Sequence, residues 1–519
     1  MESSKVTEAI RGSARGSLIL LAGQGASTVV QALGIILIAR FLGAVNFGVV
    51  SVAYIPVSLA MTLLDVGINS ALVKYLSQYR AEDNPRYRRV LIETGALINL
   101  LVGASLTAFL YLSSGYVAGA VFNQPELEPL IRFYSFILLG TTLINTVFSI
   151  LLGYERMTSR SSINVFYSFM KSIAGPILVY FGLGPIGAVL GNVAATFIAG
   201  LVGLIVVGAI WRMEPRGDPV FTHLECARLV LSYGYPLFFS HLLIGLTPNI
   251  NNFLLALFVE YELMGNYQAA VRFGVLITFF TLSVATALFP LFSKLERNAE
   301  ALKIVLVHSV KYIGLIVFPI IAAIIALSPQ IITVLYAEDY QYAGAYIRYF
   351  MLSYVVLGFG GAGLVSFLNA IGRNKVVFTE SLINFLLTVT LGLALIPRWG
   401  VEGLIASITI GPIAGLLYGL YWVKRNLGFT IDMKTAFKSL LAASVACAVT
   451  LLFASVAPLS PVLVVVSGGL LFLAVYALLV LVFRVLSHED LNNLLSVTTG
   501  LGPFSPLIRR LLVYVRKKY

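Results

Sequence analysis

Long apolar runs are the feature that most constrains how this chain can fold. Stretches of roughly 20 apolar residues recur from Leu18 to Phe483, and a helix of that length crosses the ~30 Å hydrocarbon core of a bilayer. Only 11% of the 519 residues are charged, whereas ordinary soluble domains have about a quarter. The sequence therefore predicts an all-α polytopic membrane protein and excludes a soluble globular one.

Turn and charge signals divide the apolar runs into fourteen predicted transmembrane spans. These lie near residues 18–41, 46–66, 90–112, 130–152, 161–181, 186–210, 229–257, 264–288, 304–327, 347–368, 376–396, 402–423, 437–456 and 462–483. The connections between the spans are too short to hold an extramembrane catalytic domain. We therefore expect the function to be exercised within or beside the membrane.

Basic residues predict the orientation of the chain. Most of the 35 Lys and Arg residues fall at the ends and in the even-numbered connections, while the odd-numbered connections hold Arg40, Arg132, Arg348 and Arg398. Because Lys and Arg are retained on the cytoplasmic side, both termini of this cell-membrane protein are predicted to be cytoplasmic. Topology then explains the net charge of +12 without nucleic acid. Residues 487–519 are typical of an amphipathic basic helix on the inner leaflet, or of a frayed basic tail.

Segments of the two halves of the chain resemble each other at an offset of about 217 residues. LGAVNFGVVSVA (42–53) aligns with FVEYELMGNYQAAV (258–271), and FGLGPIGAVLGNVAATFIAG (181–200) aligns with PRWGVEGLIASITIGPIAGL (397–416). The aligned glycines are Gly48 with Gly265, Gly184 with Gly400 and Gly187 with Gly403. Chance similarity between apolar helices is the alternative, but the matching blocks occur in one order.

The repeat predicts that spans 1–6 and spans 7–12 are two related six-helix lobes. Six spans preserve orientation, so the lobes would be related by an axis along the membrane normal, with a substrate site at their interface. The predicted parts are an N-terminal lobe at 1–215, a C-terminal lobe at 216–430, two extra C-terminal helices within 431–486 and the basic tail at 487–519.

Polar residues at helical spacing mark the faces of spans that avoid lipid. The first and seventh spans each have such a stripe, and the two stripes share a register. Hydrogen bonding between helices is an alternative for any single stripe. The matched stripes favour a shared substrate cavity, and its predicted polar lining is Gln24, Gln31, Tyr54, Asn164, His241, Asn249 and Asn252.

Charged residues inside the spans give the sharpest functional signal. Lys171 lies ~15 Å into the fifth span and Arg272 ~12 Å into the eighth, where an unpaired charge costs at least ~2.5 kcal/mol. An ion pair with Glu380 or Glu93 would satisfy Lys171 structurally. A cationic cavity for an anionic head group is the functional alternative, because Arg and Lys both bind phosphate oxygens. Asp65, Glu93 and Glu380 are candidates for ion coupling, although capping or ion pairing explains them equally well.

The segments ARFLGAVNFGVVSVA (39–53) and LLDVGINSALVKYLSQY (63–79) resemble the N-terminal signature of the polysaccharide transporter family, which includes O-antigen flippases. That family belongs to the multidrug/oligosaccharidyl-lipid/polysaccharide exporter superfamily. The resemblance implies a V-shaped, two-lobed transporter that gives a lipid-linked saccharide alternating access to the two membrane faces. In the similar lipid II flippases, basic residues on the first, second and eighth spans line the cavity. Arg272 matches in location, but the middle of spans 1 and 2 holds no Arg or Lys, which argues against a peptidoglycan precursor as cargo.

The leading hypothesis is a flippase for oligosaccharides on polyprenyl phosphate or pyrophosphate, serving cell-surface glycan biosynthesis. We expect no enzymatic activity, no metal and no cofactor beyond a coupling H⁺ or Na⁺. Expected partners are the lipid-linked saccharide, membrane lipids and glycan-assembly enzymes, with the protein acting as a monomer. A cation-coupled multidrug exporter, or an exporter of another lipid, is an alternative that predicts an acidic cavity. A membrane enzyme would instead need acids on an outer loop, such as Glu338 and Asp339.

Overall fold

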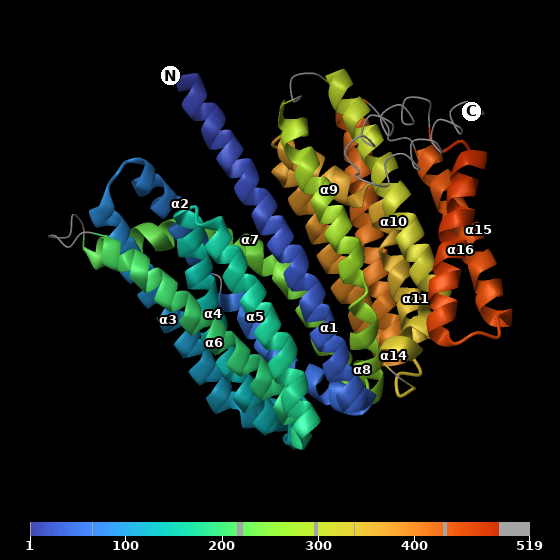
Figure 1. Cartoon of the computed structure of the whole chain (residues 1–519), viewed down its shortest axis with the longest axis horizontal. Helices are drawn as coiled ribbons and strands as arrows, with labels where there is room; N and C mark the ends of the chain where they lie inside the picture. Colours follow the sequence, from blue (N-terminus) through green and yellow to red (C-terminus); the bar gives the residue numbers. More distant parts are fainter. Residues whose placement is uncertain are drawn as a thin grey trace. The chain divides into compact units, whose positions relative to one another are not determined.

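The protein is helical throughout the part of the chain that the structure describes. This computed structural model describes residues 2–64, 66–214, 222–294, 299–336, 338–428 and 433–486, and no strand occurs among them. The prediction of an all-α chain is therefore confirmed for these residues (Figure 1). The α-helices are α1 (Glu2–Leu64), α2 (Ile68–Ala81), α3 (Pro85–Tyr116), α4 (Glu128–Gly153), α5 (Met157–Leu178), α6 (Gly184–Met213), α7 (His223–Phe258), α8 (Tyr261–Val271), α9 (Gly274–Lys294), α10 (Ala299–Tyr336), α11 (Ala343–Ser353), α12 (Val355–Gly358), α13 (Gly361–Ala370), α14 (Asn374–Leu427), α15 (Met433–Val456) and α16 (Pro461–Val482), with short π or 3₁₀ turns η1 (Val117–Val121), η2 (Pro125–Leu127) and η3 (Val179–Leu183).

Nine stretches of the described residues are long and apolar enough to cross a membrane. The chain is therefore a multi-pass membrane protein, while the count of fourteen spans stays a prediction. Three of these stretches are much longer than the ~20 residues that one crossing needs. They are Ala22–Ala81 with 60 residues, Met157–Met213 with 57 and Asn374–Leu427 with 54.

Glycines with positive φ interrupt each of the three long stretches. Gly43 has φ 71°, Gly184 has φ 54° with ψ −140°, and Gly400 has φ 54° with ψ −124°. Residues with a Cβ rarely adopt these angles, whereas glycine does so without steric cost. Each break falls between two of the predicted spans.

The chain separates into two compact units. Unit 1 comprises residues 1–272, 335–342 and 389–404, and unit 2 comprises residues 273–334, 343–388 and 405–519. The predicted lobes at 1–215 and 216–430 remain an expectation based on the repeat.

Within unit 1, α1 packs along α5 and α8, while α4 packs against both α3 and α6 (Figure 1). A buried apolar cluster joins α2, α3, α4, α6 and α7. It includes Leu72, Leu91, Leu151, Ile210 and Cys226, all at most 2% exposed. This core fixes the helices that surround the candidate site.

The crossing of α1 and α8 depends on two glycines that the repeat aligns. A Cβ on Gly48 would overlap the carbonyl oxygen of Tyr261, and a Cβ on Gly265 would overlap that of Ala44. Gly48 aligns with Gly265, and the same offset aligns Ala44 with Tyr261. The contact is therefore reciprocal, as expected where two related copies of a motif meet.

Unit 2 contains α9 to α13, most of α14, and the hairpin of α15 and α16. Small residues on α15, including Ala442 and Ala446, pack with Phe318 of α10 and Phe472 of α16. Small side chains let membrane helices approach closely. The predicted spans 437–456 and 462–483 correspond to α15 and α16, while the predicted basic tail at 487–519 lies outside the described residues.

The predicted span 264–288 is wrong as a continuous helix. Helix α8 ends at Val271 and α9 begins at Gly274, so Arg272 caps the C-terminus of α8. Gly274 weakens the helix at this point, because glycine is a poor helix former. The break leaves the Arg272 guanidinium at the negative end of the α8 dipole, a favourable place for a cation.

Candidate functional site

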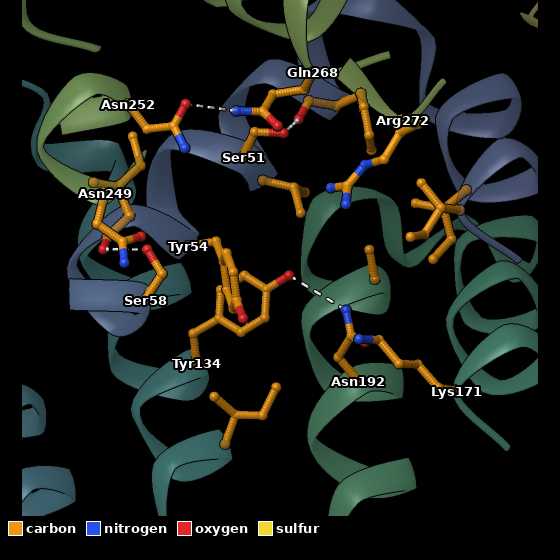
Figure 2. A pocket seen from close by; sticks show the side chains of 17 residues that line it. Ser51, Tyr54, Ser58, Tyr134, Lys171, Asn192, Asn249, Asn252, Gln268 and Arg272 are labelled. Atoms are coloured by element: carbon orange, nitrogen blue, oxygen red, sulfur yellow. Dashed lines mark hydrogen bonds between the residues drawn. The ribbon is translucent and has the colours of Figure 1, made fainter. Parts of the chain in front are cut away.

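A cavity of about 270 Å³ lies within unit 1, lined by α1, α4, α5, α6, α7 and α8 (Figure 2). Its polar lining consists of Ser51, Tyr54, Ser58, Tyr134, Lys171, Asn192, Asn249, Asn252, Gln268 and Arg272. The remaining lining residues are apolar, and none of the described residues that surround the cavity is an aspartate or glutamate. We call this space the central polar cavity.

Two cations of the central polar cavity have no ion-pair partner among the described residues of unit 1. No described carboxylate of that unit lies within 4.0 Å of Lys171 or Arg272. Lys171 instead places its ammonium 5.8 Å from the ring centroid of Tyr167. Figure 2 shows Lys171 and Arg272 on one side of the cavity, with Asn249 and Asn252 on the other. The cavity therefore has a net positive charge.

Aromatic rings and amides form the rest of the polar surface. The rings of Tyr54 and Tyr134 lie 5.4 Å apart between their centroids, and Asn192 donates a hydrogen bond of 3.4 Å to the Tyr134 hydroxyl. Gln268 donates one of 3.5 Å to the amide oxygen of Asn252. The buried amide oxygen of Asn192 has no hydrogen-bond partner among the described residues. This surface offers donors and acceptors to a ligand rich in hydroxyl groups.

The structure brings several sequence-predicted residues together at this cavity. Tyr54, Lys171, Asn249, Asn252 and Arg272 come from α1, α5, α7 and the end of α8, and all line it. Their contact with a substrate remains a prediction.

Three other predicted residues lie elsewhere along the same helices. The side-chain amide of Gln31 donates a 2.8 Å hydrogen bond to Ser168 on α5. Gln24 and Asn164 line a second, smaller cavity of unit 1, next to Arg160. Asn164 donates hydrogen bonds to the side chains of Gln24 and Ser27, at 3.3 and 3.0 Å.

The four remaining predicted residues are not among the described residues that line the central polar cavity. Asp65 and the side chain of His241 lie outside the described part of the chain. Glu93 pairs with Arg89 at 3.1 Å and accepts a 2.8 Å hydrogen bond from the Trp211 indole, so it is not the partner of Lys171. Glu380 is 9% exposed in unit 2, and its Oε2 atom has no hydrogen-bond partner among the described residues.

The Glu93 pair belongs to a wider polar network that joins α3, α4 and α6. Arg88 pairs with Glu214 at 2.9 Å, and the Tyr154 hydroxyl donates a 2.6 Å hydrogen bond to the same carboxylate. Burial and this hydrogen bond to Glu214 raise the pKa of Tyr154. Because Glu93 has structural partners here, an ion-coupling role for it has no support from its surroundings.

Tyr134 and Asn192 line the cavity but were not among the predicted residues. Other polar residues share their helix faces, with Thr196 four residues after Asn192 and Thr141 seven residues after Tyr134, but such a short stripe suits hydrogen bonds between helices as well as a cavity. The usable signal was the position of Asn192 well inside an apolar span, where a lone amide requires a partner or a cavity.

The chain is similar in sequence to two families of known proteins. The family model described as polysaccharide biosynthesis protein matches residues 13–296, more than half of the 519 residues. The chain belongs to this family. A second model, described as lipid II flippase MurJ, matches residues 237–467. This chain is thereby a membrane transporter of the multidrug/oligosaccharidyl-lipid/polysaccharide exporter superfamily, as the sequence signature predicts.

Individual relatives agree with this assignment. Lipid II flippase MurJ of Bacillus subtilis is 23% identical over 80% of this chain and 83% of its own length. Teichuronic acid biosynthesis protein TuaB of the same organism is 23% identical over 54% of this chain and 55% of its own. A solved structure of lipid II flippase MurJ superposes with a TM-score of 0.72 at 17% identity, covering 90% of this chain and 98% of the other. That superposition shows a shared fold.

Proposed function

We propose that this protein is a flippase for a saccharide attached to polyprenyl phosphate or pyrophosphate. The observation that supports this most directly is the central polar cavity, where Lys171 and Arg272 have no carboxylate partner among the described residues of unit 1. Unpaired charge inside a membrane span is costly, so its presence marks a function. The names of the relatives, a lipid II flippase and a teichuronic acid biosynthesis protein, point to the same class of cargo.

In this proposal the cations bind the phosphate of the cargo. The Arg272 guanidinium would bind two phosphate oxygens with its planar fork, while the Lys171 ammonium would act as a point charge. A hydrogen bond to a charged group contributes ~1.5–3 kcal/mol. The two side chains together would therefore dominate recognition of the head group.

The amides and tyrosines bind the sugar nearest to the phosphate. Tyr54 and Tyr134 offer flat apolar faces, and the free amide oxygen of Asn192 can accept a hydrogen bond from a sugar hydroxyl. A volume of about 270 Å³ lies near the lower end of the ~300–1,000 Å³ typical of ligand pockets. The cavity thus suits the phosphate and its first sugar, and the rest of the glycan would extend beyond it.

Transport would proceed by alternating access between two repeated halves of six spans each. The reciprocal packing of Gly48 and Gly265 supports the repeat, as do the matching backbone angles of Gly184 and Gly400. In such transporters one repeat rocks against the other around a fixed site. Fourteen spans, cytoplasmic termini and a monomeric state complete the proposal.

Glu380 is the candidate for ion coupling. Its carboxyl group is buried in unit 2 beside Gly415 and Gly419, and one oxygen has no partner among the described residues. A buried carboxylate without a partner is costly, so a bound H⁺ or Na⁺ would relieve that cost. A multidrug exporter for cationic drugs is not favoured, because the described lining of the central polar cavity includes no acidic side chain.

Reconstitution into liposomes tests the function. A fluorescent polyprenyl-pyrophosphate disaccharide is added, and its access to a membrane-impermeant lectin is followed with time. The protein should accelerate movement between leaflets, and the double variant Lys171→Gln/Arg272→Gln should lower the rate by about 100-fold or more, since two charged contacts are lost.

Charge-conserving variants provide the control. Lys171→Arg and Arg272→Lys should keep much of the rate, while Arg132→Gln, which removes a cation paired with Glu128 outside the cavity, should leave it within about twofold. No acceleration for either the phosphate-linked or the pyrophosphate-linked saccharide would refute the proposal.

A further inference from the structure

A second cavity of unit 1 contains another cation, one without a carboxylate partner among the residues that the structure describes there. The cavity has a volume of about 210 Å³ and is lined by Leu20, Gln24, Phe148, Arg160, Ser161 and Asn164. The guanidinium of Arg160 lies 5.6 Å from the ring centroid of Phe148, and no described carboxylate of unit 1 lies within 4.0 Å of it. We call this space the Arg160 cavity.

The Arg160 cavity and the central polar cavity lie along the same face of α5. Arg160, Asn164, Ser168 and Lys171 follow at intervals of four, four and three residues, which places them on one side of a helix. At 1.5 Å per residue, Arg160 and Lys171 are separated by roughly 16 Å along the axis. The face thus has a cavity with an unpaired cation at each end.

Polar side chains fill the interval between the two cations. Asn164 donates a hydrogen bond to Ser27 of α1 at 3.0 Å, and Gln31 of α1 donates one to Ser168 at 2.8 Å. The hydroxyl of Ser172 donates to the carbonyl oxygen of Val30 at 2.8 Å. This stretch of the contact between α1 and α5 is therefore polar, with hydrogen bonds from one helix to the other.

The start of α5 adds positive potential near the Arg160 cavity. Its N-cap residue is Arg156, its first turn has no acidic residue, and no side chain caps its free amide groups. The N-terminus of a helix attracts anions through its free backbone amides, and this attraction does not depend on the Arg156 side chain. The positive-inside rule assigns this end of α5 to the cytoplasmic side.

We propose that the Arg160 cavity is a second anion site, which binds the phosphate group of a lipid on the cytoplasmic side before that group reaches Lys171 and Arg272. The inference rests on the proposed function, because that function sets the direction in which the phosphate moves, from the Arg160 cavity to the central polar cavity. The chemistry it requires is one phosphate or pyrophosphate group held by the Arg160 fork, with Ser161 and Gln24 beside it. Such a group occurs both on a polyprenyl carrier and on the anionic phospholipids of the bilayer.

Binding measurements on the full-length protein in phosphatidylcholine nanodiscs test the site. Fluorescent polyprenyl pyrophosphate is titrated into the wild type, into Arg160→Gln and into Arg156→Gln. The Arg156 variant is a matched control, because it removes an equal charge from the same turn of chain but not from the cavity lining. The titration should show two binding sites, one for each cavity. Arg160→Gln should raise the Kd of one of them by about 10-fold or more, because a charge-assisted contact is lost. Arg160→Lys should restore part of it.

The outcomes separate this inference from the proposed function. Equal binding by the Arg160→Gln and Arg156→Gln variants would overturn the second site, even if Lys171→Gln/Arg272→Gln abolishes translocation. Normal translocation by that double variant would overturn the proposed function. The binding measurement on Arg160→Gln would still test the second site. A second titration series uses phosphatidylglycerol as the probe. Loss of binding confined to phosphatidylglycerol would overturn the role of the Arg160 cavity in cargo loading.

Discussion

Two helical hairpins of this protein have the same backbone break but different charges. The first hairpin, Met157–Met213, contains α5 and α6, and the second, Asn374–Leu427, is the single element α14. Both reverse at a glycine with φ 54°, Gly184 in the first and Gly400 in the second. The first directs Arg160 and Lys171 into cavities, whereas the second buries the carboxyl group of Glu380.

This difference indicates which part of the hairpin determines function. Shared glycines keep the turn and the close packing of its two arms, so the backbone is compatible with either charge. The side chains then decide the role: an anion site in the first hairpin and a candidate ion-coupling site in the second. Substitutions of the shared glycines test the common backbone, and substitution of Glu380 tests the difference in charge.

The largest expected effect concerns the shared packing. A Cβ at Gly187 would meet the backbone of Leu178, and a Cβ at Gly403 would meet that of Leu395. Because the main chain cannot easily move aside, Gly187→Ala and Gly403→Ala should each lower the free energy of unfolding by about 1–3 kcal/mol. Thermal or denaturant unfolding in detergent measures both values.

Gly208→Ala on α6 is the control for this pair. No atom lies within 4 Å of the Cβ that this substitution adds, so it should stabilise the helix by about 0.5–1 kcal/mol. If either Gly187→Ala or Gly403→Ala behaved like Gly208→Ala, the two hairpins would not be equivalent.

The next effect concerns the charged residue of the second hairpin. Glu380→Gln should leave binding of polyprenyl pyrophosphate within about twofold, but should abolish acceleration of transport by an imposed ion gradient. A gradient of one pH unit supplies about 1.4 kcal/mol per proton, or a tenfold effect at most. Transport into liposomes with imposed pH or Na⁺ gradients separates the two coupling ions. A variant that still responds to both gradients would remove Glu380 from the mechanism.

Much of this architecture could be predicted from the sequence, because bilayer thickness fixes helix length and glycine marks the breaks. Lone cations inside apolar runs also identified Lys171 and Arg272, since lipid tolerates neither without a partner or a cavity. Helical spacing shows which residues share a face, but not which cavity each one reaches. Gln24 and Asn164 were therefore grouped with Lys171, although Asn164 lies roughly 10 Å away along the α5 axis and lines the Arg160 cavity.

The interruption at Arg272 and the cavity residues Tyr134 and Asn192 could not be derived in the same way. Apolar length does not reveal a helix that stops and restarts within a span, because both pieces have the same composition. A single tyrosine or asparagine is equally suited to an interhelical hydrogen bond and to a ligand. Only the packing of α4 and α6 around α1 decides between these alternatives for Tyr134 and Asn192.

The smallest expected effect distinguishes helix α7 from both hairpins. Helices α5 and α14 begin without a side-chain cap, whereas α7 begins with a capping box in which the backbone amide of Thr222 donates to Glu225 at 2.7 Å. That bond and one from the Thr222 hydroxyl lower the pKa of Glu225. A lowered folded-state pKa stabilises the protein above the unfolded value of about 4.3, and the contribution disappears as pH falls through the folded value.

Substitutions of Thr222 and Glu225 separate the contribution of the hydroxyl group to the capping box from that of the carboxylate. Thr222→Ala should cost about 0.5–2 kcal/mol, because an N-cap acceptor is lost. Glu225→Gln keeps a side chain that can bond to the N-cap, so it should lower the melting temperature slightly at neutral pH. Its difference from the wild type should vanish as the pH falls through the lowered folded-state pKa of Glu225. A difference that persists unchanged in acid would mean that the carboxylate charge at Glu225 contributes nothing to the start of α7.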